Sequence, residues 1–183
     1  MGSVLRKLFI ISLLIGLVAC AKLGVSIAPP KDIESSELGL IFGNIQAPER
    51  ITEVVLRKYG KIYIRPFNRP PRVLVYKNGD FMAENLEPGS YILAEVSTAG
   101  ERYSLINQKI DAYQNIVDLN PGDVKYMGSY RIFDLRPEDG RREKFEIISQ
   151  RKPDEREVVK HLYDKSRGTG WQDLFNKRLM ELR

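Results

Sequence analysis

The sequence predicts a mainly β protein, an antiparallel β-sandwich followed by one or two C-terminal α-helices. Short stretches with alternating apolar residues recur between residues 38 and 149, and Gly, Pro and Asn separate them. Strands of this length and spacing are typical of a sandwich rather than of a βαβ fold. Past residue 150 the apolar residues recur at helical spacing instead. With 43% hydrophobic and 29% charged residues, the composition agrees with a folded domain and excludes a disordered or fibrous chain.

Each predicted strand has apolar residues at alternate positions or a β-branched run. Asn78 and Gly79 predict a hairpin turn, because both residues tolerate positive φ. Two Leu-x-Pro-Gly sequences, at 86–89 and 119–122, predict type II turns, since Pro presets φ and Gly supplies a positive φ. The predicted strands are 38–43, 52–56, 61–65, 73–75, 90–98, 103–106, 115–119, 124–133 and 144–148.

Two helices are predicted at the C-terminal end. Asp154 and Glu157 have the spacing of a capping box, and Gly168 is expected to end that first helix. Thr169 with Gln172 would cap the second helix. We expect the helices to pack on the sandwich or to cover an open end of it; the second helix could instead lie on a membrane surface. Its apolar stripe consists of Trp171, Leu174, Phe175, Leu179 and Leu182.

The first twenty residues have the pattern of a secretory signal. Arg6 and Lys7 precede an apolar stretch at 8–19, which is too short to cross a bilayer. The stretch ends in Leu-Val-Ala-Cys at 17–20, which resembles the lipobox of bacterial lipoprotein precursors, and Cys20 is the only cysteine of the chain.

The lipobox resemblance implies a definite chemistry. The Cys20 thiol becomes a thioether to diacylglycerol, the leader is cut between Ala19 and Cys20, and the new amine is acylated. Two or more acyl chains give a stable membrane anchor. The resemblance implies a bacterial cell envelope, and Ala21 favours the outer membrane of a Gram-negative cell. An ordinary signal peptide with an incidental cysteine, or a buried core cysteine, are the alternatives.

These observations divide the chain into four parts. Residues 1–19 are the expected lipoprotein signal peptide, and 20–36 are the lipidated cysteine with a flexible tether, because a Pro pair and small residues show no clear period there. Residues 37–150 are the expected sandwich domain, and 151–183 are the helices packed on it.

A second resemblance lies within the sandwich. Gly-Asn-Ile at 43–45, Asn-Gly-Asp-Phe at 78–81 and Leu-Glu-Pro-Gly-Ser-Tyr at 86–91 occur in an order that resembles the transthyretin-like, or carboxypeptidase-regulatory-like, domains. The resemblance covers residues 38–98. It implies a transthyretin-like or immunoglobulin-like sandwich, and relatives that are mostly non-catalytic accessory, adhesive or carrier modules. The basic, Pro-rich segment 61–72 is a departure from that family.

The residues that usually carry catalysis or bind metals are few. One His and one Cys exclude a disulfide framework and a zinc cluster within the chain. Nucleophile-elbow, EF-hand and phosphate-loop spacings are absent, so no catalytic residue, metal or cofactor is predicted. His161 is expected at a helix surface or interface. The carboxylate pairs Asp80/Glu84 and Glu138/Asp139 have the composition of ordinary turns.

A basic segment is the strongest anomaly. Residues 54–79 contain seven Lys or Arg residues, interleaved with aromatic residues, and no acid. Export makes nucleic acid an unsuitable target, so the candidate partner is an anionic envelope component: lipid headgroups, lipopolysaccharide or cell wall. The alternative is a solvated strand face whose charges pair with Glu84, Glu87 or Glu95. The candidate binding residues are Arg65, Phe67, Arg69 and Arg72.

The sequence therefore favours a non-enzymatic, membrane-anchored envelope lipoprotein that binds a partner or an envelope component. The alternatives from other classes are a carboxylate-dependent cell-wall or glycan hydrolase and a structural subunit of an envelope complex. A hydrolase requires two acids at catalytic separation.

Overall fold

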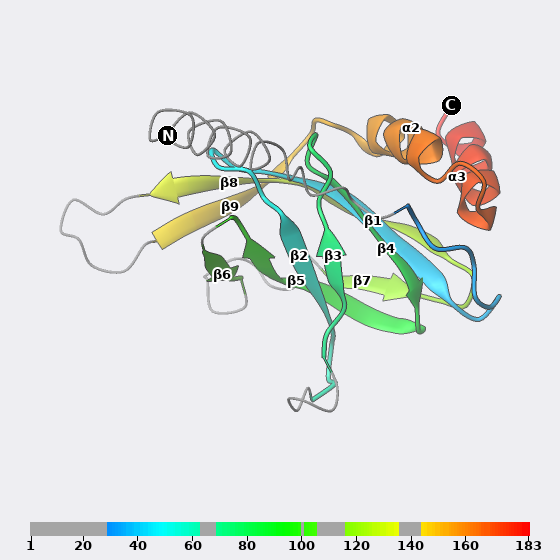
Figure 1. The fold of residues 1–183 in the computed structure, drawn as a ribbon, viewed down its shortest axis with the longest axis horizontal. Helices are drawn as coiled ribbons and strands as arrows, with labels where there is room; N and C mark the ends of the chain where they lie inside the picture. The colour runs from blue at the N-terminus through cyan, green and yellow to red at the C-terminus, as the bar shows by residue number, and fades with distance from the viewer. Residues whose placement is uncertain (1–28, 63–68, 100, 106–115, 136–143) are drawn as a thin grey trace, which may run out of the picture.

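The computed structural model describes residues 29–62, 69–99, 101–105, 116–135 and 144–183. Ala19 and Cys20 lie outside these residues. The described part is mainly β with two C-terminal helices, which confirms the predicted fold class (Figure 1). Its elements are β1 (Gly39–Gln46), β2 (Glu53–Lys58), β3 (Arg72–Leu74), β4 (Asp80–Leu86), β5 (Gly89–Ser97), β6 (Arg102–Ser104), β7 (Ile116–Leu119), β8 (Val124–Leu135), β9 (Lys144–Gln150), α2 (Glu155–Lys165) and α3 (Gly170–Glu181).

The strands form two sheets. Sheet A has the order β4-β1-β8-β9, and sheet B has the order β3-β2-β5-β6 with β7 also paired to β5. All pairs are antiparallel except β1 with β8, which run parallel. The prediction of a purely antiparallel sandwich is wrong at this pair. The turn after β7 carries the chain from sheet B to sheet A, and β8 joins sheet A where β1 begins, with Leu40 N donating to Asp123 O at 2.8 Å.

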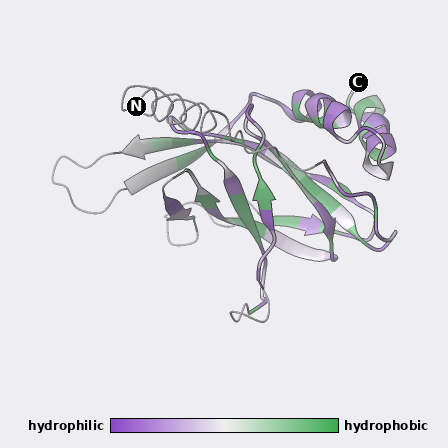
Figure 2. Ribbon diagram, viewed as in Figure 1, coloured by the Kyte–Doolittle hydropathy of each residue, from purple (hydrophilic) through white to green (hydrophobic). Residues whose placement is uncertain are grey.

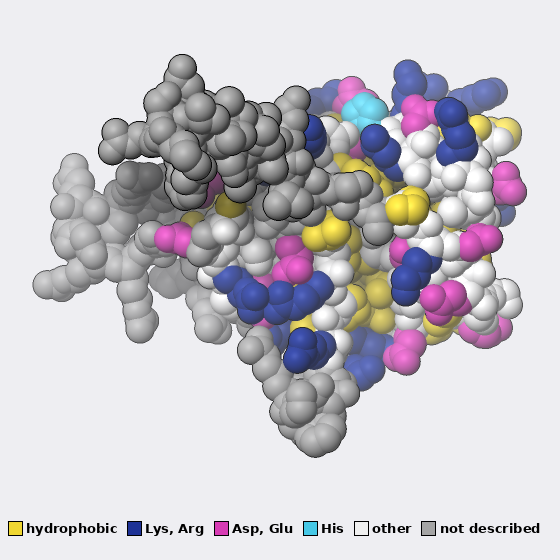
Figure 3. Space-filling view, viewed as in Figure 1, with side chains coloured by type: hydrophobic (Ala, Val, Ile, Leu, Met, Phe, Trp, Pro, Cys, Tyr) yellow, Lys and Arg dark blue, Asp and Glu magenta, His cyan; other side chains and the backbone are white. Residues whose placement is uncertain are grey.

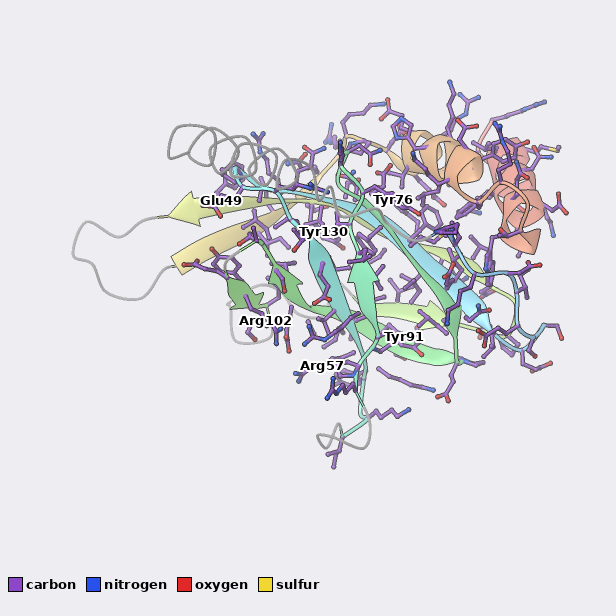
Figure 4. The ribbon with its side chains drawn as sticks, viewed as in Figure 1. Glu49, Arg57, Tyr76, Tyr91, Arg102 and Tyr130 are labelled. Atoms are coloured by element: carbon purple, nitrogen blue, oxygen red, sulfur yellow. The ribbon has the colours of Figure 1, made fainter. Side chains whose placement is uncertain are left out.

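The main core lies between the two sheets and is formed by the inward side chains of both. Tyr91 of β5 and Tyr130 of β8 belong to this core, and each hydroxyl donates to a backbone carbonyl, those of Glu87 and Met127 (Figure 4). Burial raises the pKa of Tyr130 to about 12. The hydrogen bonds allow these two large side chains to be buried without leaving an unpaired hydroxyl.

A second apolar cluster lies on the outer face of sheet A. Leu40 and Phe42 of β1 pack there against Trp171 and Phe175 of α3, and the rings of Phe42 and Phe175 meet edge to face at 5.5 Å. Figure 2 shows apolar residues concentrated on the strands and polar residues on the outside of both helices. The expectation that the helices pack on the sandwich is confirmed, and β1 is consequently buried on both of its faces.

The two helices begin in different ways. Asp154 caps α2 as predicted: its carboxylate accepts from Glu157 N at 3.0 Å, and the Glu157 carboxylate accepts from Asp154 N at 2.9 Å. Thr169 makes no side-chain cap on α3, so that prediction is wrong. The Asp32 carboxylate accepts from Gly170 N at 2.7 Å instead. An acid is well suited to this position because the helix N-terminus is partly positive.

Asp32 belongs to a segment, residues 31–34, that we call the strap. Lys31 N donates to the Glu84 carboxylate at 2.8 Å, and Glu34 N donates to the Asn85 side chain at 3.0 Å. The Asn85 amide returns a hydrogen bond to Asp32 O at 2.9 Å. The strap was expected within a flexible tether, but it lies along the end of β4. The folded domain therefore begins several residues before Glu37.

Candidate functional site

The outer face of sheet B carries the charges of the basic segment. Arg57 of β2 reaches Glu95 of β5 at 2.8 Å, and Arg72 of β3 reaches Glu53 of β2 at 2.7 Å. Figure 3 shows basic and acidic side chains close together on this face, and Figure 4 shows the position of Arg57. Each pair joins neighbouring strands of the sheet. Both pairs are partly exposed, and pairs of that kind stabilise a fold by only about 0.2–1 kcal/mol. They nevertheless neutralise two of the predicted cations, including the candidate residue Arg72.

Glu87, in the turn before β5, shares its single negative charge between two more cations, so one positive charge remains among the three groups. Its carboxylate lies 3.5 Å from the ammonium of Lys61 and 3.4 Å from that of Lys58. The charge of Lys61, followed by the hydrogen bond and charge of Lys58, lowers the pKa of Glu87. The paired-charge alternative is thus confirmed for Glu87 and Glu95. Glu84, the third acid named in that alternative, binds the strap.

The connection from β2 to β3 is the remaining part of the basic segment. Arg65 and Phe67 lie outside the described residues, and Arg69 is exposed. Tyr59 and Ile62 are 60% and 79% exposed. We call the described residues 59–62 and 69–71 the arm, which extends away from both sheets (Figure 1). The arm combines exposed apolar side chains with cations, as surfaces that contact anionic amphiphiles do.

A polar cluster that the sequence did not predict lies between sheet A and α2. Asp80 of β4 is almost fully buried, and its carboxylate accepts from the amide of Asn44 at 2.7 Å. The amide of Asn78 also donates to it, and Nδ1 of His161 lies 3.2 Å away. His161 comes from α2 and is the interface histidine that the sequence favoured. Its partner was not predictable, because 81 residues separate the two.

Burial dominates the electrostatics of Asp80 and raises its pKa, while Asn44, Asn78 and His161 act in the opposite direction. The amides of Asn44 and Asn78 and the ring of His161 therefore contact a carboxylate whose burial disfavours its charged form. The cluster ties the hairpin turn at 78–79 to helix α2. It is a connection between elements, and it reaches solvent through the exposed side chains of His161 and Asn78.

Nucleophiles and acid pairs near this cluster are otherwise engaged. The Ser129 hydroxyl donates to Pro153 O at 2.5 Å and lies 2.7 Å from the Tyr126 hydroxyl. Asp80 and Glu84 both lie on β4, about 13 Å apart along the strand by its rise per residue. Their contacts are with α2 and with the strap, so they do not face a shared cleft. Glu138 and Asp139 lie outside the described residues. Within the described ranges, no group of three or more His, Cys, Asp or Glu residues could hold a metal ion.

A cavity of about 430 Å³ opens beside the strap. Its walls come from residues 29–31 and 34, from 71–74 at the base of the arm, and from 82–86 of β4. The N-terminal segment and the base of the arm therefore lie on the same side of the domain. No sequence signal predicted the cavity, because its N-terminal wall contacts β4 residues that lie 51 to 53 positions further along the chain.

Comparisons with known proteins add little. No protein-family model and no curated protein matches the chain. One solved structure that resembles it is the crystal structure of a DUF3823 family protein from Bacteroides ovatus, with 15% sequence identity and a TM-score of 0.29. The match covers 52% of this chain and 47% of that protein, so the chain spans about half the length of that structure. At this TM-score the likeness carries no argument about function. No helix in the described part of the chain is long and apolar enough to cross a membrane.

Proposed function

We propose that this protein is a membrane-anchored envelope lipoprotein whose sandwich domain is a non-catalytic binding module. Cys20 carries the lipid, and residues 1–19 are removed when the anchor is made. The motif Leu-Val-Ala-Cys at 17–20 and its single cysteine support the anchor. The motifs of residues 43–45, 78–81 and 86–91 support a transthyretin-like origin for the domain.

The observation that carries the proposal is the position of the strap. Cys20 and Pro30 are ten residues apart, so the chain between them spans at most about 35 Å. The strap is bound to β4 and α3 from Lys31 onwards, so a lipid on Cys20 would tether the domain from that side. The base of the arm is on that side.

The arm then has a role in the same proposal. With the domain held close to a bilayer, Tyr59 and Ile62 contact the interface and Lys61 and Arg69 face anionic headgroups. Each cation near such a surface contributes about 1 kcal/mol, and the contribution falls as salt is added.

Metabolic labelling with a clickable fatty acid tests the anchor. The wild-type protein should incorporate the label and lose residues 1–19, whereas Cys20→Ala should incorporate none and keep its leader. An unlabelled wild-type protein, or a label that survives in Cys20→Ala, would reject the anchor.

Lysine acylation of the full-length lipidated protein in nanodiscs tests the arm. Lys61 should react more slowly in phosphatidylglycerol discs than in phosphatidylcholine discs, and high salt should remove the difference. Lys160, an exposed residue of α2, is the internal control and should react equally in both. Equal reaction of Lys61 in the two lipids would remove the arm from the proposal.

A further inference from the structure

We propose that the cavity beside the strap binds an extended segment of a partner protein that carries a lysine or arginine side chain. The site adjoins the arm at Pro71, but it depends neither on the exposed cations of the arm nor on a lipid at Cys20. Its geometry follows from the way β3 and β4 separate, and its chemistry follows from Glu84.

The cavity exists because two hairpin strands diverge. Val75 and Phe81 pair next to the 76–79 turn, and Tyr76 N donates to Asp80 O at 2.8 Å. Beyond that point β3 joins sheet B and β4 joins sheet A. β3 and β4 are the edge strands of their sheets, and the cavity occupies the gap between these edges. An open strand edge is a surface to which an extended chain can add.

The register shows which backbone groups face this gap. Val75 N donates to Thr52 O and Leu56 N donates to Pro71 O, so the backbone groups of Arg72, between those pairs, point away from β2. On the other wall, Ile45 N donates to Gly79 O, and the same alternation directs the backbone of Met82 away from β1. An extended segment would therefore meet backbone donors and acceptors on both walls.

Glu84 supplies the charge that selects a cation. A bulge interrupts the pairing of β1 with β4 here, and Asn85 beside it has a φ of 55°. Bulges redirect side chains and are frequent beside binding sites. One Glu84 oxygen accepts from Lys31 N. The other, Oε2, is sealed from solvent and has no hydrogen-bond partner in the part of the chain that the structure describes, so a cation in the cavity reaches it only when the Glu84 side chain rotates toward the cavity. A buried acceptor without a donor is costly, and an ammonium or guanidinium group would remove that cost.

The other charges along the cavity are already paired. Arg72 is bound to Glu53 at 2.7 Å, and the Lys31 ammonium lies 3.9 Å from Glu34. Of the acids that line the cavity, Glu84 has a buried carboxylate oxygen without a hydrogen-bond partner among the described residues. Burial raises its pKa, while the backbone N–H and the charge of Lys31 act in the opposite direction. The charge therefore favours a cationic segment over a neutral or acidic one.

The remaining lining suits the stem of a long basic side chain. Val73, Leu74, Met82 and Leu86 supply apolar surface, and Leu74 is 40% exposed. Lysine and arginine bury their methylene stems on such surface and direct the charge to a polar partner. A volume of about 430 Å³ lies within the range of small ligand sites and accommodates one such side chain with adjoining backbone.

Fluorescence polarisation with labelled peptides tests the site, with the full-length protein in a zwitterionic detergent. The probe is a blocked five-residue peptide of sequence Val-Thr-Lys-Val-Thr, compared with the same peptide carrying norleucine or glutamate at its centre. The lysine peptide should bind about tenfold more tightly than the norleucine peptide, and the glutamate peptide should bind least. Equal binding of the lysine and norleucine peptides, or no binding of either at millimolar concentration, would overturn the proposal.

Two variants locate the effect. Glu84→Gln keeps an acceptor for Lys31 N and should abolish the preference for lysine over norleucine, whereas Glu87→Gln, outside the cavity, should preserve it. Leu74→Lys places a competing ammonium at the cavity and should also weaken lysine-peptide binding. A preference that survives both cavity variants would overturn the assignment. Sedimentation of the peptide-free protein provides a further check, because dimerisation that Leu74→Lys abolishes would mean that a second copy occupies the site.

Discussion

The outer faces of the two sheets differ in almost every respect. The outer face of sheet A is apolar at Leu40 and Phe42 and is covered by α2 and α3. The outer face of sheet B carries ion pairs such as Arg57–Glu95 and is not covered by either described helix. Sheet A therefore contributes to stability on both faces, while the outer face of sheet B and the gap between the edge strands β3 and β4 remain accessible. The difference indicates that binding is to be sought at sheet B, the arm and the cavity.

The largest expected effect comes from uncovering sheet A. Phe175→Ala should lower the free energy of unfolding by about 3–5 kcal/mol, because its fully buried ring packs on Phe42. Met180→Ala, on the exposed side of the same helix, should change it by less than about 0.5 kcal/mol. Urea unfolding measures both variants. An equally small change in the free energy of unfolding for both variants would show that the helices are not part of the cooperative core.

The polar cluster of sheet A should give the next largest effect. Asp80→Asn replaces one of the two oxygens that the Asn44 and Asn78 amides bind with an NH2 group. The variant should lower the free energy of unfolding by about 1–3 kcal/mol at low pH. The pKa of Asp80 is raised in the folded state, so its contribution is fully present below the unfolded pKa and is lost as pH rises through the folded pKa. The deficit of the variant relative to wild type should therefore shrink as the pH rises above 3.8, the ordinary pKa of an aspartate. A deficit that grows with pH in urea titrations would contradict the direction assigned to this pKa.

The strap connects helix α3, which covers sheet A, with β4 at the edge of that sheet. Asp32→Ala should lower the free energy of unfolding by about 1 kcal/mol, because the carboxylate caps α3 and holds the strap against this helix. Thr169→Ser at the same helix keeps the hydroxyl that donates to Ser166 O and should cost less, because Thr169 makes no side-chain cap on α3. Thermal unfolding of the two variants gives the comparison, and a larger loss for Thr169→Ser would contradict the assignment of the cap to Asp32.

The smallest effect should come from sheet B. A double-mutant cycle of Arg57→Ala and Glu95→Ala should give a coupling of about 0.2–1 kcal/mol, reduced by added salt. A coupling of several kcal/mol would mean that sheet B depends on its outer charges for stability, and the contrast between the two faces would fail.

The local parts of the fold were predictable from the sequence, and the long-range parts were not. The capping box at Asp154 and the turn at 78–79 depend on residues close in sequence, and both are present. The β4 strand was not predicted, because Asp80, Glu84 and Asn85 interrupt its apolar pattern. Those polar residues have partners in α2 and the strap, which are distant in sequence.

Two errors have similar physical causes. The strand expected at 61–65 is not present at Lys61 or Ile62, which lie in the arm, and its other residues are outside the described part. Alternation in a short segment does not distinguish a strand from an exposed connection. Asp32 looked like part of a tether because a cap contributed from 138 residues away leaves no periodic signal. The cavity and Glu84 were beyond prediction for the same reason.

Intact-mass analysis of the N-terminal peptide from protein made in a bacterial host is the most direct test of the membrane-anchored account. The account predicts a peptide that starts at Cys20 and carries a diacylglyceryl thioether with one further acyl chain on its amine. A peptide that retains residues 1–19 together with a free Cys20 thiol would contradict it.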